Sequence, residues 1–277
     1  MSNIIPKPNH NPKILNIIGA GLAGTEAAWQ ASNLGIEVNL FEMRPKRSTA
    51  AHQTSNLAEL VCSNSFRSNS IKNAVGLLKE EMRKLDSLIM NCAEESKIPA
   101  GTALAVDREI FSKKVTEKIE ENPKINLIRE EVESLDFFKD STTIIATGPL
   151  TSDSLSEEIK KLTNEKYLYF YDAISPIVHG DSIDMSIAFF GSRYGKGSSD
   201  EEGDYINIGL NKEQYTNFID ELTKGDKIPL RDFEKAIFFE GCLPIEVMAS
   251  RGVDTLAYGA MKPIGIENPR TKKRFYA

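Results

Sequence analysis

ILNIIGAGLAGTEAAWQASNLGIEVNLFE, residues 14–42, is the stretch that decides the fold. Its apolar start, residues 14–18, is typical of a buried parallel strand, and the glycines follow at once. Good helix formers fill residues 24–34, Gly35 stands where a helix C-cap is expected, and residues 36–41 alternate as a second strand. Strand, glycine turn, helix, strand and acid in this order predict a dinucleotide-binding unit of the Rossmann type.

The three glycines of the turn have separate roles in such a unit. Gly19 permits the tight turn, Gly21 lets the backbone approach a pyrophosphate, and Gly24 allows the helix to pack close to the sheet. The free N–H groups at the helix start then face the phosphates. The predicted phosphate-binding residues are Gly19, Ala20, Gly21, Leu22, Ala23 and Gly24.

Two further positions decide which dinucleotide is bound. Glu42 ends the second strand, where its carboxylate can accept hydrogen bonds from ribose hydroxyls and repels a 2′-phosphate, although Arg44 nearby leaves some room for NADP. Residues 143–148, TIIATG, resemble the Ala-Thr-Gly signature of two-dinucleotide-binding-domain flavoproteins, whose turn lies near bound FAD. Glu42, Arg44, Thr147 and Gly148 are therefore predicted cofactor-binding residues, and FAD is favoured over NAD.

The rest of the chain predicts an α/β fold with a second, smaller part. Apolar spacing of three and four predicts one long amphipathic helix over residues 70–95, and the glycine-rich stretch 191–209 predicts a hairpin or loop. We expect a Rossmann-type FAD-binding domain at 1–160, an inserted α+β domain at 161–260, and the start of a return to the first domain at 261–277.

Helix, strand and loop patterns also fill the region between the two parts of the cofactor site. Residues 108–121 predict a helix and residues 125–128 a strand. The polar connection at residues 43–69 is longer than a linker needs, and long ordered loops are often functional. His52, in this loop, is interpreted as an ordinary loop histidine.

Composition excludes several classes of protein. The 277 residues carry a net charge of −6, which gives no sign of nucleic-acid binding, and no apolar run is long enough to span a bilayer. With no recognisable signal peptide, a cytoplasmic protein without a membrane partner is expected. No cysteine pair or His/Asp/Glu cluster has the spacing of a metal site. The basic residues interpreted as solvated charges are Arg67, Lys72, Lys79, Arg83, Lys84, Arg270, Lys272, Lys273 and Arg274.

Two cysteines stand among small or turn-forming residues, and one does not. Cys62 lies in AELVCSNS and Cys242 in FFEGCLPIE, whereas Cys92 falls on the apolar stripe of the predicted long helix. An isolated cysteine is more often a small buried apolar residue than a nucleophile, and Cys92 fits that interpretation.

These segments make the sequence resemble the folate- and FAD-dependent tRNA (uracil-5-)-methyltransferases, the TrmFO family, also called Gid. The resemblance is carried by GAGLAG (19–24), EMRP (42–45), LVCSNS (60–65), NAVGLLKEEMR (73–83), PAG (99–101), ALAVDR (103–108), ATGPLT (146–151), FEGC (239–242), EVMASRG (246–252), MKP (261–263) and Gly265. It runs from about residue 14 to the end.

The resemblance implies a reaction and its partners. Methylenetetrahydrofolate would supply a carbon to the T-loop uridine of tRNA at position 54, FAD would carry and reduce it, and NAD(P)H would recharge the flavin. A thiolate adding to C6 of uracil would make C5 nucleophilic, a role for Cys62, while Cys242 would be a proton acceptor or auxiliary thiol. A homodimer stays open.

Other interpretations remain at this point. A related flavoenzyme modifies the wobble uridine of tRNA and shares the glycine turn; a general NAD(P)- or FAD-dependent oxidoreductase and a non-catalytic binding module are further alternatives. Family members run beyond residue 277, so we expect this chain to bind FAD poorly and to show no turnover.

Overall fold

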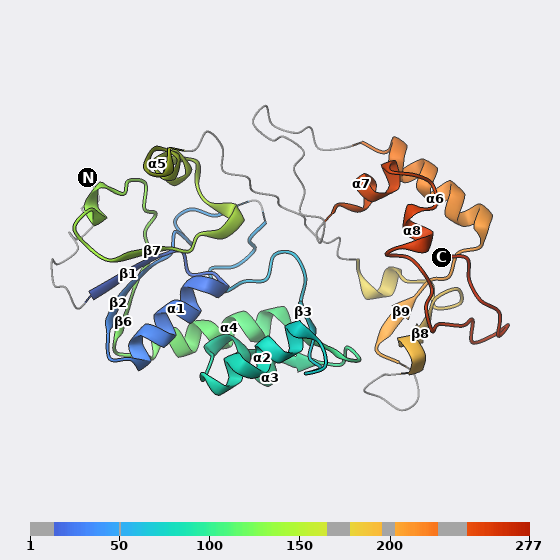
Figure 1. Cartoon of the computed structure of the whole chain (residues 1–277), viewed down its shortest axis with the longest axis horizontal. Helices are drawn as coiled ribbons and strands as arrows, with labels where there is room; N and C mark the ends of the chain where they lie inside the picture. The colour runs from blue at the N-terminus through green and yellow to red at the C-terminus, as the bar shows by residue number, and fades with distance from the viewer. Residues whose placement is uncertain (1–13, 50, 165–177, 196–202, 227–242) are drawn as a thin grey trace. The chain divides into compact units, whose positions relative to one another are not determined.

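The computed structural model describes residues 14–49, 51–164, 178–195, 203–226 and 243–277. The chain divides into two compact units (Figure 1). The first, the N-terminal unit, comprises Met1–Ile98 and Leu104–Ile174; the second, the C-terminal unit, comprises Pro99–Ala103 and Ser175–Ala277. The domain limits expected from the sequence, at residues 160 and 260, stay predictions.

A parallel sheet forms the centre of the N-terminal unit. Its strands are β1 (Ile14–Ile18), β2 (Glu37–Phe41), β6 (Ile125–Ile128) and β7 (Thr143–Ile145), in the order β6-β2-β1-β7. All three pairings are parallel, with Ile18 opposite Phe41 on one side and Ile145 on the other. This is the order of the first four strands of a dinucleotide-binding fold, so the α/β prediction is confirmed.

The side chains of the sheet alternate between two apolar layers. Ile17 and Leu40 are buried in a cluster with side chains of α1 (Leu22–Asn33) and α4 (Arg108–Glu120). Ile18 and Phe41 point into a second cluster, whose other members include Leu155 of α5 (Asp153–Thr163). The period of two in the strands thus covers both faces of the sheet with helices, as Figure 1 shows for α1, α4 and α5.

The prediction of one long helix over residues 70–95 is wrong. The segment forms two helices, α2 (Ala74–Lys84) and α3 (Leu88–Glu95). Asp86 between them has a left-handed backbone (φ 54°), and the Ser87 side chain caps α3 by accepting from the Met90 N–H. A left-handed residue cannot continue a right-handed helix, and the capping serine starts a new one.

Short elements complete the N-terminal unit. β3 (Ser65–Ser68), β5 (Ala103–Val106) and β4 (Lys97–Ile98) form a small sheet in that order. η1 (Asp136–Phe138) and η2 (Gly148–Leu150) are short 3₁₀ helices of this unit.

The C-terminal unit has its own core. β8 (Phe189–Gly191) and β9 (Tyr205–Asn207) pair antiparallel, which confirms the predicted hairpin in its described residues. The other elements are η3 (Gly180–Ser182), η4 (Arg193–Gly195), α6 (Lys212–Lys224), α7 (Ile245–Ser250) and α8 (Thr255–Tyr258). Tyr215 is fully buried, packs with Leu256 and Ala277, and donates its hydroxyl to the Val253 carbonyl. No helix among the described residues is long and apolar enough to cross a membrane.

The cysteine of α3 gives a testable contrast with Cys62. Cys92 is fully buried, and burial raises the pKa of its thiol to about 11. At pH 8 we expect iodoacetamide to modify exposed Cys62 and to leave Cys92 unmodified until the protein unfolds, as peptide mass spectrometry would report.

Cys92→Ala tests the same thiol through stability. We expect a loss of about 1 kcal/mol at pH 7, typical of a small change in a packed core. Because the folded pKa of Cys92 is raised above that of the unfolded chain, wild-type stability should fall further between pH 9 and 11, and this part of the fall should disappear in Cys92→Ala. An unchanged alkaline profile would contradict the assignment.

Candidate functional site

A cleft opens where β1 and β7 end. β1 pairs with β2 on one side and with β7 on the other, so the connections from these strands run in opposite directions across the sheet. Ligands of open α/β sheets bind at such a switch point, at the carboxyl ends of the strands. The cleft is open to solvent, and the empty space in it together with the solvent at its mouth is about 560 Å³. It is lined by Ile18, Gly19, Ala20, Gly21, Phe41, Glu42, Met43, Arg44, His52, Glu130, Glu131, Val132, Ala146, Thr147, Leu150, Thr151, Ser152 and Leu155.

Two glycines of the turn are required by close contacts within the protein. Gly19 has φ +97°, and a Cβ there would lie 2.8 Å from the Ala146 carbonyl oxygen. A Cβ on Gly24 would lie 1.8 Å from the Gly19 carbonyl oxygen. Any side chain at either position would therefore push α1 or the β7 turn away from β1.

Gly21 differs from these two glycines, because the protein itself leaves space for a side chain there. A Cβ there would meet no atom within 4 Å, and the residue lines the cleft. Gly21 is also the N-cap of α1, which has no side-chain cap and no acid in its first turn. The positive end of this helix is thus left for a ligand, and the space beside Gly21 fits a phosphate group held by backbone N–H groups.

Glu42 is fixed at the end of β2 by hydrogen bonds to its carboxylate. The oxygens accept from the Ala20 N–H at 3.2 Å and from the Arg44 N–H and Nε–H at 3.1 and 2.9 Å. Burial alone would raise the pKa of Glu42, but the hydrogen bonds and charge of Arg44 outweigh it and the pKa is lowered. The carboxylate thus stays ionised beside the cleft, as recognition of ribose hydroxyls requires.

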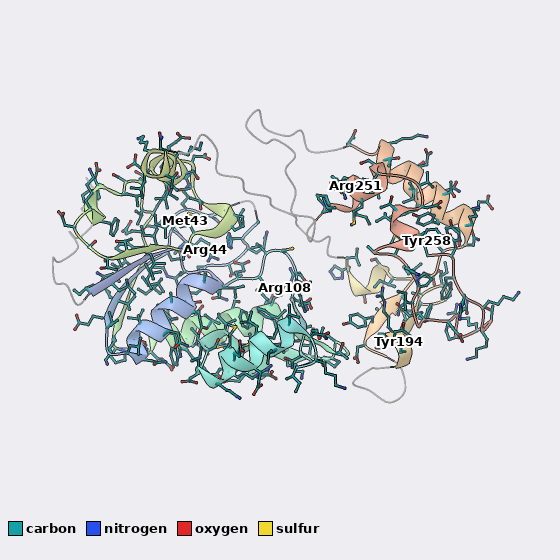
Figure 2. All side chains as sticks on the ribbon, in the orientation of Figure 1. Met43, Arg44, Arg108, Tyr194, Arg251 and Tyr258 are labelled. Atoms are coloured by element: carbon teal, nitrogen blue, oxygen red, sulfur yellow. The ribbon has the colours of Figure 1, made fainter. Side chains whose placement is uncertain are left out.

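Arg44 is buried between two carboxylates. Its Nη1 lies 3.0 Å from Oε2 of Glu59, while its Nε bonds Glu42, and both ion pairs have little exposure. Glu59 also accepts from the N–H groups of Gln53 and Thr54, so it holds the loop that follows Arg44. With two carboxylates already around it, Arg44 is a poor partner for a 2′-phosphate. Figure 2 shows Met43 and Arg44 close to the upper end of α1.

The far side of the cleft contains residues that sequence reasoning did not select. Glu130 and Glu131 follow β6, and they pair with Lys46 and with Arg47, the latter at 2.5 Å. His52, interpreted as an ordinary loop residue, lines the cleft and lies 2.8 Å from the Thr49 hydroxyl. The sequence could have indicated Glu130 and Glu131 as cleft residues, because they follow the third parallel strand as Glu42 follows the second.

The predicted cofactor residues divide between the cleft and other places. Thr147 lines the cleft and its hydroxyl lies 2.6 Å from that of Thr151, whereas Gly148 starts η2 with φ +63° and lies outside the lining. Leu22 and Ala23 instead line an apolar groove formed with α2 and α3. The glycine turn therefore offers Gly19, Ala20 and Gly21 to a ligand, and the side chains of Leu22 and Ala23 line the other groove.

Lys79 also lines this groove, and the interpretation of its charge as solvated is wrong. Lys79, expected to be solvated, is buried and donates to the carbonyls of Ser68 and Val75 at 3.0 and 3.1 Å. Burial, reinforced by nearby Arg83 and Arg67, lowers its pKa. Lys79 thus ties β3 to α2.

Cys62 lies on a loop that is tied to the start of α4. Cys62 is exposed, and its backbone carbonyl accepts a hydrogen bond from Nη2 of Arg108 at 3.1 Å. Asn64 exchanges two hydrogen bonds with Val106, one through its backbone and one through its side chain, each 3.0 Å long. Cys62 is not among the residues lining the cleft, and Cys242 lies outside the described residues. Figure 2 labels Arg108, at the start of α4.

Comparison with known proteins gives one family and several relatives. The family model described as Glucose inhibited division protein A matches residues 14–275. A Natranaerobius thermophilus protein named methylenetetrahydrofolate–tRNA-(uracil-5-)-methyltransferase TrmFO is 57% identical over 95% of this chain and 59% of its own. The Bacillus subtilis protein of that name is 54% identical over 96% of this chain and 60% of its own.

Among solved structures, Aquifex aeolicus GidA in its form II crystal is similar over 49% of this chain and 25% of that chain. The TM-score is 0.39 and the sequence identity is 16%. The chain spans about 60% of the length of the two curated relatives above.

The glycines give a matched pair of variants. In Gly21→Val the backbone is extended (φ −74°, ψ −166°) and the side chain enters the open cleft, so the fold should persist while FAD binding is lost. Gly24→Ala should instead destabilise the protein by about 3 kcal/mol or more, because its Cβ meets backbone. Circular dichroism and thermal unfolding of this chain, and FAD titration of a version that carries the further residues of its relatives, separate the two. FAD occupancy equal to that of the wild type in folded Gly21→Val would refute the site.

Arg44→Met tests the buried ion pairs. Leaving the carboxylates of Glu42 and Glu59 without their cation should cost about 3–5 kcal/mol, against at most about 1 kcal/mol for the control Arg47→Met at the surface. Urea unfolding at pH 7 measures both.

The stability of the wild type and of Arg44→Met should also depend differently on pH. In the wild type the pKa of Glu42 is lowered, so its stabilisation is present above about pH 4.5 and is lost as the pH falls further. In Arg44→Met burial still raises that pKa, and only the backbone N–H groups of Ala20 and residue 44 still oppose it, so the gain in stability above pH 4.5 should become smaller. The same slope in both proteins would show that Arg44 does not control Glu42.

Proposed function

The chain belongs to the glucose inhibited division protein A family, and on this premise we propose that it acts as a folate- and FAD-dependent tRNA (uracil-5-)-methyltransferase. The product would be 5-methyluridine in the T loop of tRNA, with methylenetetrahydrofolate as carbon donor and NAD(P)H as reductant. The observation that carries the proposal is the 57% identity to a relative named for this reaction, over 263 residues. The activity and partners of the whole protein stay part of the proposal.

The cleft fits the cofactor that this reaction needs. Gly21 and the open end of α1 would hold the pyrophosphate of FAD, and Glu42 would accept from the ribose of its adenosine. Thr147 would lie on the side of the cleft that β7 forms. Bound FAD would supply the redox chemistry by which the one-carbon unit is carried and reduced to a methyl group. In this proposal the N-terminal unit is an FAD domain into which the smaller α+β domain is inserted.

Cys62 is proposed as the nucleophile. C5 of uracil is a weak carbon nucleophile, and addition of a thiolate to C6 places an electron pair on the C5–C4–O4 system, from which C5 can attack an electrophilic carbon. Loss of the C5 proton and expulsion of the thiolate then restore the ring. Exposure of Cys62 suits a substrate base presented by a large RNA, and Arg108 holds the backbone of the same residue.

The remaining partners follow from the same proposal. Cys242 would be the proton acceptor or an auxiliary thiol. We also place the protein in the cytoplasm, where tRNA is modified, and a homodimer remains a prediction.

Covalent trapping tests the nucleophile. A version that carries the further residues of its relatives should form a stable adduct with tRNA containing 5-fluorouridine, because fluorine at C5 cannot leave as a proton does. Cys62→Ala should give no adduct on denaturing gels and no 5-methyluridine by nucleoside mass spectrometry. Cys92→Ala, the matched control, should retain both. An adduct in Cys62→Ala would move the nucleophile elsewhere, first to Cys242.

A further inference from the structure

Two distant segments of the C-terminal unit lie side by side around Tyr194. The Tyr194 N–H donates to the Gly265 carbonyl at 2.9 Å, and Nη2 of Arg193 lies 3.4 Å from the Lys262 carbonyl oxygen. The second segment is the MKP-x-G motif at residues 261–265, which neither the cleft nor the Cys62 loop uses. Its position therefore needs another explanation.

Gly265 is shaped to receive the tyrosine ring. It has φ +69°, and a Cβ on it would lie 2.7 Å from Cδ1 and 2.8 Å from Cγ of Tyr194. Only a residue without a side chain allows the ring and the backbone to come this close. The edge of the Tyr194 ring thus packs against the backbone of this motif at Gly265.

The rest of the tyrosine is presented to solvent at a cost. Tyr194 is 66% exposed, and its backbone is left-handed (φ 59°, ψ 23°). A bulky residue seldom adopts this conformation, and an aromatic ring usually gains stability by being buried. A strained, exposed and supported ring indicates a contact surface, since strain of this kind concentrates at functional sites.

Two cationic side chains, Arg193 and Lys262, belong to the two segments that meet at the ring, and the acid Asp204 also lies near it, its backbone N–H donating to the Ser192 hydroxyl. Arg193 and Lys262 are both exposed, and their segments are joined by the hydrogen bond from the guanidinium. Residues 261–277 contain five basic residues, Lys262, Arg270, Lys272, Lys273 and Arg274, and one acid, Glu267, although the whole chain is acidic. An aromatic face flanked by cations is the combination that binds unpaired nucleotides, because the ring stacks on a base while the cations contact phosphates.

We propose that Tyr194, Arg193 and Lys262 form a stacking platform for an unpaired base of a structured RNA and its flanking phosphates. That this RNA is tRNA rests on the proposed function. All three residues belong to the C-terminal unit, whereas Cys62 and the residues of the cofactor cleft belong to the N-terminal unit, so the platform would add an RNA contact made by other residues.

The ring is tested by two variants of Tyr194 in the 277-residue chain. Tyr194→Gly removes the ring and suits the left-handed backbone, so the melting temperature should not fall. Its affinity for an unmodified tRNA transcript should fall on the order of 5- to 150-fold. Tyr194→Phe keeps the stacking face and should bind like the wild type. Tyr258→Ala, at a tyrosine 70% exposed in α8, is the control and should also bind like the wild type.

The cations are tested by salt dependence in filter binding. Arg193→Gln and Lys262→Gln should each lower the slope of log affinity against log salt by about 0.7, the value for one phosphate contact on single-stranded nucleic acid. A fully paired RNA duplex should bind the wild type and Tyr194→Gly equally, because it offers no unstacked base. An acidic peptide should not compete with tRNA for the wild type.

The platform would be overturned by wild-type affinity in Tyr194→Gly, by an equal loss for the duplex and the tRNA, or by displacement of tRNA by the acidic peptide, which would indicate a protein partner. Absence of RNA binding by the wild-type chain would also overturn it. The methyltransferase proposal is judged separately, by 5-methyluridine formation and by trapping at Cys62, so either can fail without the other.

Discussion

The contact between Gly24 and the Gly19 carbonyl is the constraint on which the N-terminal unit depends. It lets α1 start directly at the end of β1, so that the helix covers one face of the sheet while its N-terminus opens into the cleft. The same closeness brings Ala20 within reach of the Glu42 carboxylate, which links the turn to β2. The packing of α1 and the position of the cleft are thus set by one approach of backbone to backbone.

Arg44 extends this constraint into the loop that follows β2. Its guanidinium is held by Glu42 on one side and Glu59 on the other, and Glu59 in turn receives N–H groups of the loop. Charges out of water require partners with good geometry. The loop therefore has little freedom to leave the cleft wall, although it has no helix or strand of its own between residues 51 and 64.

Local patterns predicted the fold well where one interaction dominates. β1, β6 and α4 lie within a residue of their predicted ranges, because apolar runs and an Asp107 cap specify them locally. The break at Asp86 was missed since the apolar spacing continues across it. In the site, Gly21 and Glu42 were recognisable from spacing, and Glu130 could have been recognised because it follows a parallel strand. Glu59 and the burial of Arg44 depend on loop geometry that no short pattern encodes.

The edge position of β7 has a consequence for how the sheet can grow. Among the described strands β7 pairs only with β1, and Ile144 and Ile145 keep 39% and 37% of their surface exposed. After β7 the chain enters α5, which packs on the face opposite α1. Crossovers between parallel strands are right-handed in nearly all proteins. Because the handedness is fixed, the face on which α5 lies sets the direction in which the sheet can grow: a parallel strand that follows α5 would add beside β7, on the edge away from β1.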